Sequence, residues 1–272
     1  MHHARYIIVG CSRSGSTAVH VAIRGHPNVA AREGEMSIAP FFSQGLDMYT
    51  DSCAPQDVQQ RARLALFDAL SLAEADAKTT HCGIKVCAQS PWQADVIVDA
   101  LRRYMPEMKV ILTIREDLVA QYASLRKAMS SKIWHSWSLN ADRERERTIH
   151  LKPWSFRRYA RKCLYVMSTL GQLKESHETY ECNYEDLLSD PNRIYGELFD
   201  RLGLPQVEVT WQTSRKLNPS PSQYVRNYEQ ISRLFRDLRG QVPHHRLPWH
   251  ARGPNYLVER VSRCFHPRTK EM

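Results

Sequence analysis

The sequence predicts an α/β fold, a single domain with a doubly wound parallel sheet flanked by helices. Short runs of apolar, β-prone residues at 6–9, 82–86 and 109–114 alternate with amphipathic stretches that have helical spacing. A loop of small residues follows the first run and an arginine follows the third, so polar groups lie where strands end. Because no internal repeat or long linker divides the 272 residues, we predict one domain over 1–272.

Composition and charge restrict the class of protein. A mean hydropathy of -0.51 with 42% hydrophobic residues indicates a globular protein with a sizeable core. The chain contains no run of 18 apolar residues and no hydrophobic leader, so we expect a cytoplasmic protein without a transmembrane helix. The net charge of +9 suits a multiply charged anionic ligand. We expect no nucleic acid as a partner, because the excess charge is spread along the chain.

The cysteines indicate neither a disulfide framework nor a metal site. Their number, seven, is odd and no C-x-x-C pair occurs, so we predict no bound metal. Cys11 lies in the glycine-containing loop, where a helix N-terminus is expected to lower its pKa. We interpret it as a small loop residue rather than a nucleophile.

The first strand, loop and helix form the clearest motif in the chain. Residues 6–9 predict a buried strand, residues 10–17 a loop, and the helical spacing from Ser16 stops at Gly25. In this arrangement backbone N–H groups and a helix N-terminus face an anion. The letters G-C-S-R-S-G-S-T are similar to the nucleotide P-loop, G-x-x-x-x-G-K-[ST], so we expect a P-loop-like sheet.

The departure from the P-loop pattern is informative. Ser16 stands where the P-loop lysine belongs, which disfavours triphosphate chemistry but still allows a 5′-phosphate to bind. The cation is Arg13, within reach of the oxygen that bridges a phosphate to its leaving partner. The predicted 5′-phosphate contacts are Arg13, Ser14, Gly15, Ser16 and Thr17.

The R-S-G-S-T motif, the helix behind it and H-P-N-V at 26–29 resemble the phosphosulfate loop of sulfotransferases that use 3′-phosphoadenosine 5′-phosphosulfate (PAPS). The similarity is closest to bacterial carbohydrate enzymes, of the Nod-factor and trehalose type, and to tyrosylprotein sulfotransferases. Its motifs extend from Tyr6 to about Tyr228. The resemblance implies PAPS as cofactor, adenosine 3′,5′-bisphosphate as product, and a hydroxyl-bearing acceptor, on a carbohydrate or a glycolipid.

The loop at 29–42 carries two candidates for the catalytic base. In the related enzymes, a glutamate after H-P-x-V and a glycine is proposed to deprotonate the acceptor hydroxyl. Gly34-Glu35 matches that pattern best, and a slip of one position would make Glu33 the base instead. A positioned base contributes typically ~10²–10⁴-fold to the rate.

The second predicted strand contains a lysine, Lys85. A lysine in a buried strand is costly unless it reaches an anion or a cleft. The resemblance implies that Lys85 lies at the reacting centre, where it stabilises charge on the transferring sulfuryl group together with Arg13. The alternative is that Lys85 lies on an exposed edge.

An arginine and a serine nine residues apart, Arg115 and Ser124, follow the third strand. The resemblance implies that this pair binds the 3′-phosphate of PAPS, and the planar guanidinium is a bidentate phosphate donor. ATP lacks a 3′-phosphate, so the pair distinguishes this prediction from an ATP enzyme. The alternative partners of Arg115 are Glu116 and Asp117.

Five later residues complete the predicted site through the resemblance. Trp134 is a candidate for the acceptor cleft, and His135 is a rival base because cytosolic members use a histidine. Tyr184, in the Y-E-D-L segment, is expected to contact the cofactor. Arg215 and Lys216 are the candidates in a basic loop that closes over the nucleotide, although the G-x-x-G-x-x-K of cytosolic enzymes is absent.

The chain beyond Ser232 is basic and proline-rich, and we assign about 240–272 to a C-terminal extension. Such a segment is compatible with peripheral membrane contact, and the resemblance is compatible with a homodimer. Two alternative functions stay open: a P-loop kinase of a small hydroxyl substrate, and a nucleotide-binding protein without enzymatic activity.

Overall fold

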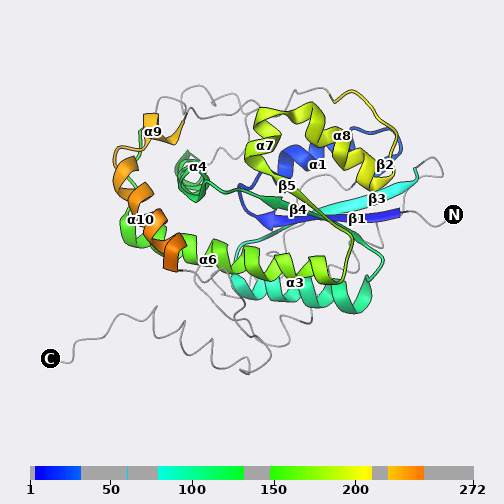
Figure 1. Cartoon of the computed structure of the whole chain (residues 1–272), viewed down its shortest axis with the longest axis horizontal. Coiled ribbons are helices and arrows are strands. Elements are labelled where there is room, and N and C mark those ends of the chain that lie inside the picture. Colours follow the sequence, from blue (N-terminus) through cyan, green and yellow to red (C-terminus); the bar gives the residue numbers. More distant parts are fainter. Residues whose placement is uncertain (1–3, 32–59, 61–78, 132–147, 210–219, 242–272) are drawn as a thin grey trace.

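A parallel sheet forms the centre of the computed structural model, which describes residues 4–31, 60, 79–131, 148–209 and 220–241. Within these residues the strand order is β2-β3-β1-β4-β5 (Figure 1). The strands are β1 (Ala4–Cys11), β2 (Val29–Ala31), β3 (His81–Ala88), β4 (Lys109–Ile114) and β5 (Thr179–Asn183). From β1 the chain turns first to one side, to β2 and β3, and then crosses to β4 and β5 on the other. The topological switch point therefore lies at the carboxyl end of β1, where open α/β sheets bind ligands.

Helices cover both faces of the sheet, as Figure 1 shows. Alternate residues of a strand point to opposite faces, so Ile7 and Val9 pack with α3, α4, α6 and α10, whereas Tyr6 and Ile8 pack with α1, α7 and α8. The helices are α1 (Ser16–Arg24), α3 (Pro91–Tyr104), α4 (Leu118–Ser131), α6 (Pro153–Gly171), α7 (Tyr184–Ser189), α8 (Pro191–Leu202), α9 (Pro221–Tyr224) and α10 (Tyr228–Gln241), with a 3₁₀ turn at Gln172–Glu175.

The predicted fold class is confirmed: this is an α/β domain with a P-loop-like, doubly wound parallel sheet. One local prediction is wrong. The short strand β2 occupies the start of the segment expected to be a loop, because Val29 to Ala31 pair with the amino end of β3.

None of the described helices is both long enough and apolar enough to span a membrane.

Helix α10 was not predicted from the sequence, which is basic and proline-rich beyond Ser232. Ile231, Leu234, Phe235 and Leu238 follow the i, i+3, i+4, i+7 spacing of an amphipathic helix and pack on the core that α6 shares. The helix was not predicted because the proline-rich composition of the residues that follow it outweighed this helical spacing. The extension assigned to about 240–272 lies outside the described residues, apart from the last two residues of α10.

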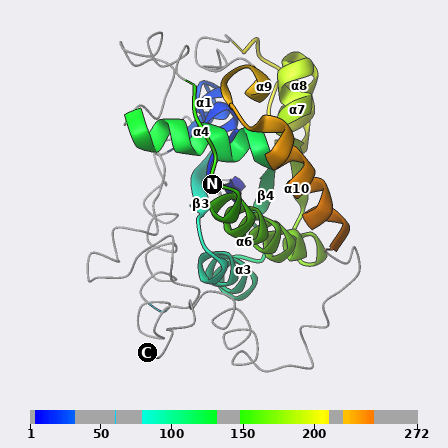
Figure 2. The same ribbon diagram turned by 90° about the vertical axis from the view of Figure 1, so that its left-hand side faces the viewer.

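The elements around the carboxyl ends of the strands frame the candidate site. Figure 2 views the molecule from this end, with α4, α9, α10 and α6 toward the viewer. Helix α9 packs against α4, and α10 packs against both α4 and α6. The C-terminal helices thus lie beside the loop that follows β1.

Candidate functional site

The loop between β1 and α1 has an unusual backbone that follows from its sequence. Arg13 has a φ of 67° and Gly15 a φ of 93°, both in the left-handed region. Left-handed residues alternating with right-handed or extended ones turn successive N–H groups toward a common point, where an anion can bind. Gly15 is the N-cap of α1 and has no side chain to bond the first N–H groups of the helix. The loop backbone can therefore accept an anion at the start of α1.

Two side chains hold the carbonyl groups of this loop on its far side. Gln121 Nε2 donates to the Ser12 carbonyl at 2.7 Å, and Arg115 Nη1 donates to the Arg13 carbonyl at 3.2 Å. These bonds tie the Ser12 carbonyl to α4 and the Arg13 carbonyl to the end of β4. The side chain of Gln121 is buried, so this tie is part of the core.

A chain of hydroxyl groups fastens the loop to β4. Thr113 Oγ1 donates to the Val9 carbonyl at 3.2 Å, so its lone pairs accept the Ser14 hydroxyl proton at 2.7 Å. The Ser14 N–H also donates inside the protein, to the Cys11 carbonyl at 3.2 Å. Ser14 therefore holds the loop in shape with both of its donors.

Gly10 has no room for a side chain, and Gly10→Ala is expected to destabilise the fold. A Cβ there would lie 2.2 Å from Thr113 Oγ1 and 2.6 Å from the Thr113 carbonyl oxygen. Overpacking of this kind costs roughly 1–3 kcal/mol or more, and we expect a lower melting temperature by calorimetry. Gly171→Ala is the matched control, since no atom lies within 4 Å of its Cβ position. Equal melting temperatures for the two variants would contradict the close contact.

Lys85 reaches from β3 to the start of α1. Its Nζ donates to Thr17 Oγ1 at 2.9 Å, and the residue is only 3% exposed. Exposure on a strand edge is therefore excluded, because β3 lies between β2 and β1. Ser16, which replaces the P-loop lysine, is buried with its hydroxyl 3.4 Å from Cys87 Sγ. The ammonium group at this end of the loop comes from β3.

Arg115 lies at the other end of the loop, against an aromatic ring. Its guanidinium carbon is 4.3 Å from the centroid of the Tyr184 ring. That ring also covers Gly15, whose Cβ position is 2.6 Å from Tyr184 Cδ2. Arg115 Nε is buried and makes no hydrogen bond to the described residues. The structure thus holds a preoriented guanidinium with donor capacity to spare.

Arg13 joins the loop to the serine that follows Arg115 along the chain. Its Nε donates to Ser124 Oγ at 3.1 Å, which leaves the Ser124 hydroxyl proton available to donate elsewhere. Arg13, Arg115, Ser124 and Tyr184 come from four separate segments, and the fold brings them together at the carboxyl ends of β1, β4 and β5. An anion with two phosphate groups suits this arrangement of cations and hydroxyls.

The carboxylates after β4 do not neutralise Arg115. Asp117 Oδ1 accepts the Ala120 N–H at 2.8 Å near the start of α4. Glu116 accepts a hydrogen bond from Asn183 Nδ2 at 3.2 Å. Glu185 in turn accepts the backbone N–H groups of Glu116 and Asp117, at 3.2 Å and 3.3 Å. These bonds join the β4–α4 turn to the β5–α7 turn and so position Arg115 beside Tyr184.

The expectation that a helix N-terminus lowers the Cys11 pKa is wrong. Cys11 is the last residue of β1, 4% exposed, with its thiol directed at the Cys163 carbonyl 3.9 Å away. Contact with the Cys163 thiol and burial together raise its pKa well above the ordinary value. A buried thiol of this kind is inert toward electrophiles at neutral pH.

Several candidates from the sequence lie outside the described residues: Glu33, Glu35, Trp134, His135, Arg215 and Lys216. Three positioning residues were missed, namely Thr113, Gln121 and Glu185. Thr113 gave a weak signal, a hydroxyl within a buried strand, because such a group needs a partner. Gln121 and Glu185 gave no signal in the sequence, since their hydrogen-bond partners are backbone groups about 70 to 110 positions away.

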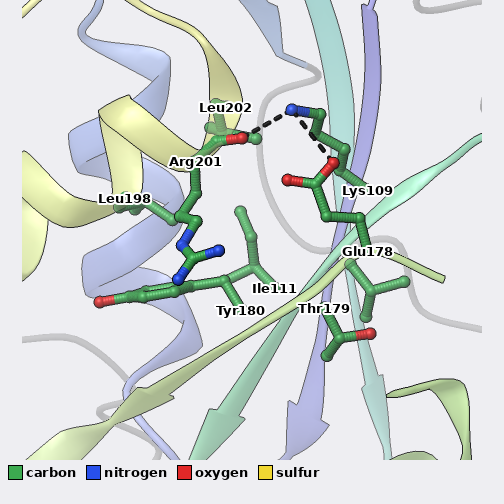
Figure 3. A pocket seen from close by; sticks show the side chains of 9 residues that line it. Lys109, Ile111, Glu178, Thr179, Tyr180, Leu198, Arg201 and Leu202 are labelled. Atoms are coloured by element: carbon green, nitrogen blue, oxygen red, sulfur yellow. Dashed lines mark hydrogen bonds and ion pairs between the residues drawn. The ribbon is translucent and has the colours of Figure 1, made fainter. Parts of the chain in front are cut away.

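A pocket lies at the opposite end of the sheet. Figure 3 shows it between the amino ends of β4 and β5 and the end of α8. Lys109 Nζ donates to the Arg201 carbonyl at 2.6 Å and pairs with Glu178 at 3.4 Å. These bonds hold the end of α8, and the pocket has no part in the phosphate site. Within the described residues, no three His, Cys, Asp or Glu side chains form a metal-binding group.

Comparison with known proteins places the chain in a family. The sequence profile described as "Sulfotransferase family" matches residues 6–208. No curated protein sequence matches the chain. Similar solved structures include a sulfotransferase from Alicyclobacillus acidocaldarius, with 15% identity over 87% of this chain and 93% of that chain and a TM-score of 0.47.

Two further structures extend the comparison. The sulfotransferase domain from the curacin biosynthetic pathway has 15% identity, covers 96% of this chain and 98% of that chain, and gives a TM-score of 0.49. A sugar kinase from Janibacter sp. HTCC2649 has 13% identity, covers 75% and 96%, and gives 0.41. Since the matched profile includes the loop after β1, Arg115 and Tyr184 and spans most of the chain, the protein belongs to the sulfotransferase family.

Proposed function

We propose that the protein transfers a sulfuryl group from PAPS to the hydroxyl of a carbohydrate or glycolipid. Membership of the sulfotransferase family supports the reaction class. The acceptor class rests on the likeness of R-S-G-S-T, the helix after it and H-P-N-V to bacterial carbohydrate sulfotransferases. Homodimer formation and membrane contact through the basic C-terminal segment stay predictions from the sequence.

The observation that carries the donor assignment is the unused donor capacity of Arg115. Its buried Nε has no hydrogen-bond partner among the described residues, and a buried donor without a partner costs about 1–3 kcal/mol. The Ser124 hydroxyl accepts a hydrogen bond from Arg13, so its own proton is available to donate. A phosphate that accepts from both groups satisfies them. Adenosine 3′,5′-bisphosphate has such a phosphate in addition to the one for the loop.

The residues fit PAPS at each of its charged ends. The backbone N–H groups of 15–17 would hold the 5′-phosphate, Arg115 and Ser124 the 3′-phosphate, and Tyr184 the adenosine. Arg215 and Lys216 are the proposed basic contacts from the C-terminal loop. When bound, PAPS supplies the sulfuryl group, which passes to the acceptor by in-line displacement.

The protein's own groups would assist in two ways. Lys85 is held by Thr17 at the start of α1, and we assign it, with Arg13, to the charge that develops around the sulfuryl group and the leaving phosphate. Glu35 would accept the proton of the acceptor hydroxyl, with Glu33 and His135 as rivals. Trp134 would line the acceptor cleft.

The test is calorimetric binding of adenosine 3′,5′-bisphosphate, adenosine 5′-phosphate and ATP to the wild type and to Arg115→Ala. We expect the bisphosphate to bind best and its affinity to fall roughly 10- to 100-fold in Arg115→Ala, because charged hydrogen bonds contribute about 1.5–3 kcal/mol. Affinity for adenosine 5′-phosphate should fall less than that for the bisphosphate, because this ligand loses only the tie from Arg115 to the Arg13 carbonyl.

Arg103→Ala is the control for this experiment. Arg103 is exposed on α3 and pairs with Asp99 at 2.5 Å, away from the loop after β1. Its replacement should leave all three affinities unchanged. Equal binding of the three nucleotides by the wild type, or a preference for ATP with magnesium, would overturn the donor assignment and favour a kinase. Selective binding of the bisphosphate without turnover on any acceptor would favour a nucleotide-binding protein.

A further inference from the structure

The outward face of the first half of α6 is basic and begins with an aromatic ring. Trp154, Arg157 and Arg161 are exposed, and Lys152 is exposed at the N-cap. Trp154, Arg157 and Arg161 are spaced by three and four residues, so they lie on one side of the helix, while its buried residues pack toward the sheet. The helix contains no Asp or Glu. We call Lys152, Trp154, Arg157 and Arg161 the α6 surface.

The cations of this surface are not explained by the stability of the helix. Arg157 and Arg161 form no ion pair with the residues that the structure describes. Lys152 stands at the N-cap, where a short polar side chain is preferred, and a positive charge at a helix N-terminus opposes the helix dipole. Charge of one sign that is neither paired nor favoured by its own helix suits an anionic partner.

The aromatic ring indicates which anionic partner fits. Trp154 is 66% exposed, more than any other large hydrophobic side chain among the described residues. A soluble polyanion would pair with the arginines and leave this ring in water. An anionic bilayer satisfies both groups, because tryptophan is favoured at the level of the lipid head groups and cations are attracted to the lipid charges.

The α6 surface lies at the same end of the molecule as the candidate site. Cys11, the last residue of β1, has its thiol 3.9 Å from the Cys163 carbonyl in the middle of α6. The Phe156 ring, earlier in α6, lies against Tyr122 of α4, with 5.7 Å between centroids, and Ser124 follows on that helix. The first half of α6 therefore extends past the carboxyl end of β1 toward α4, and both helices face the viewer in Figure 2.

We propose that the α6 surface docks on an anionic lipid bilayer, with Trp154 in the interface and Arg157 and Arg161 against the charged head groups. Docking in this way would bring the candidate site to an acceptor that is held in the bilayer. The identification of that acceptor as a glycolipid rests on the proposed function, whereas the docking itself does not. This contact is separate from the one that the sequence predicts for the basic C-terminal segment.

The experiment is sedimentation of the full chain with vesicles of equal parts phosphatidylserine and phosphatidylcholine, beside vesicles of phosphatidylcholine alone. We expect tighter binding to the anionic vesicles. The double variant Arg157→Gln, Arg161→Gln should bind them roughly 25-fold more weakly at low salt, about fivefold for each cation. This difference should shrink at high salt, because salt screens exposed charges. Trp154→Ala should weaken binding at both salt concentrations, since burial of the ring is not screened.

The end of α3 provides a matched control. It also presents an aromatic ring, Tyr104 at 47% exposed, beside two arginines. There the charges are paired, Arg102 with Glu175 at 3.4 Å and Arg103 with Asp99 at 2.5 Å. The double variant Arg102→Gln, Arg103→Gln and the single variant Tyr104→Ala remove the same kinds of group, and we expect both to bind the vesicles as the wild type does.

Two results would overturn this inference. One is equal binding of the anionic vesicles by the wild type and the α6 variants, which would leave any lipid contact to another part of the chain. The other is a loss confined to the arginine variant, with an equal loss of binding to heparin and no effect of Trp154→Ala, which would assign the surface to a soluble acidic partner. Affinity for adenosine 3′,5′-bisphosphate should be the same in all these variants, so its absence in the wild type would refute the proposed function alone.

Discussion

Replacing Lys85 with methionine is expected to lower the turnover number by about 10²–10³-fold, the usual effect of removing one preorganised donor from a transition state. Lys85 is 3% exposed and held by Thr17 at the start of α1, so its ammonium group has low mobility and little water around it. Charge stabilisation is strong in such surroundings. Formation of adenosine 3′,5′-bisphosphate from PAPS, with an acceptor found by screening carbohydrates and glycolipids, is the measurement.

Binding should separate chemistry from folding in this variant. Calorimetric affinity for adenosine 3′,5′-bisphosphate should change little in Lys85→Met, because the product lacks the sulfuryl group. Lys109→Met is a matched control: it removes a lysine from β4, another strand of the same sheet, at the far end of the sheet (Figure 3). A Lys85→Met protein with full turnover would remove Lys85 from the reaction.

Glu35→Gln is expected to lower the turnover number by about 10²–10⁴-fold, since an amide cannot accept the proton of the acceptor hydroxyl. The substitution keeps the size and shape of the side chain, so affinity for adenosine 3′,5′-bisphosphate should be retained. Glu33→Gln is the comparison, because the two glutamates are two positions apart in the same segment. We expect it to keep most of its activity.

The pair of variants distinguishes the three candidate bases. Loss of activity in Glu33→Gln alone would exchange the two glutamates. Full activity in both variants, with loss in His135→Ala, would assign the proton to the histidine. The pH dependence of the turnover number provides a further check: a carboxylate base loses activity as pH falls through its pKa, near 4.3 in model peptides, and a histidine does so near 6.5.

Much of the fold was predictable because short, contiguous stretches of the sequence specify its strands and helices. The buried strand at 6–9, the loop and the helix that stops at Gly25 are contiguous, and the structure has β1, the loop and α1 in these places. The strand expected at 109–114 has the same bounds as β4. A helix is also recorded in 228–241, where Ile231, Leu234 and Leu238 lie on one face. It was missed because composition outweighed periodicity in that segment.

Residue type and strand-end position together predicted where Arg13, Arg115 and Ser124 gather. In a parallel sheet the carboxyl ends of neighbouring strands meet at one edge, so polar residues that follow β1 and β4 must lie close together. The structure adds what these residues do to one another. Arg115 donates to the Arg13 carbonyl, Arg13 donates to Ser124, and the Tyr184 ring lies against the Arg115 guanidinium.

The sequence by itself determined the fold class, the phosphate-shaped loop and the strand ends from which its cations come. Only the tertiary structure decided that Lys85 meets Thr17, that Thr113 leaves no room at Gly10, and that Arg115 lies against Tyr184. The physical reason is the range of the interactions. Strands and helices arise from patterns within about ten residues, whereas side-chain contacts depend on how helices pack, which no local period of the sequence records.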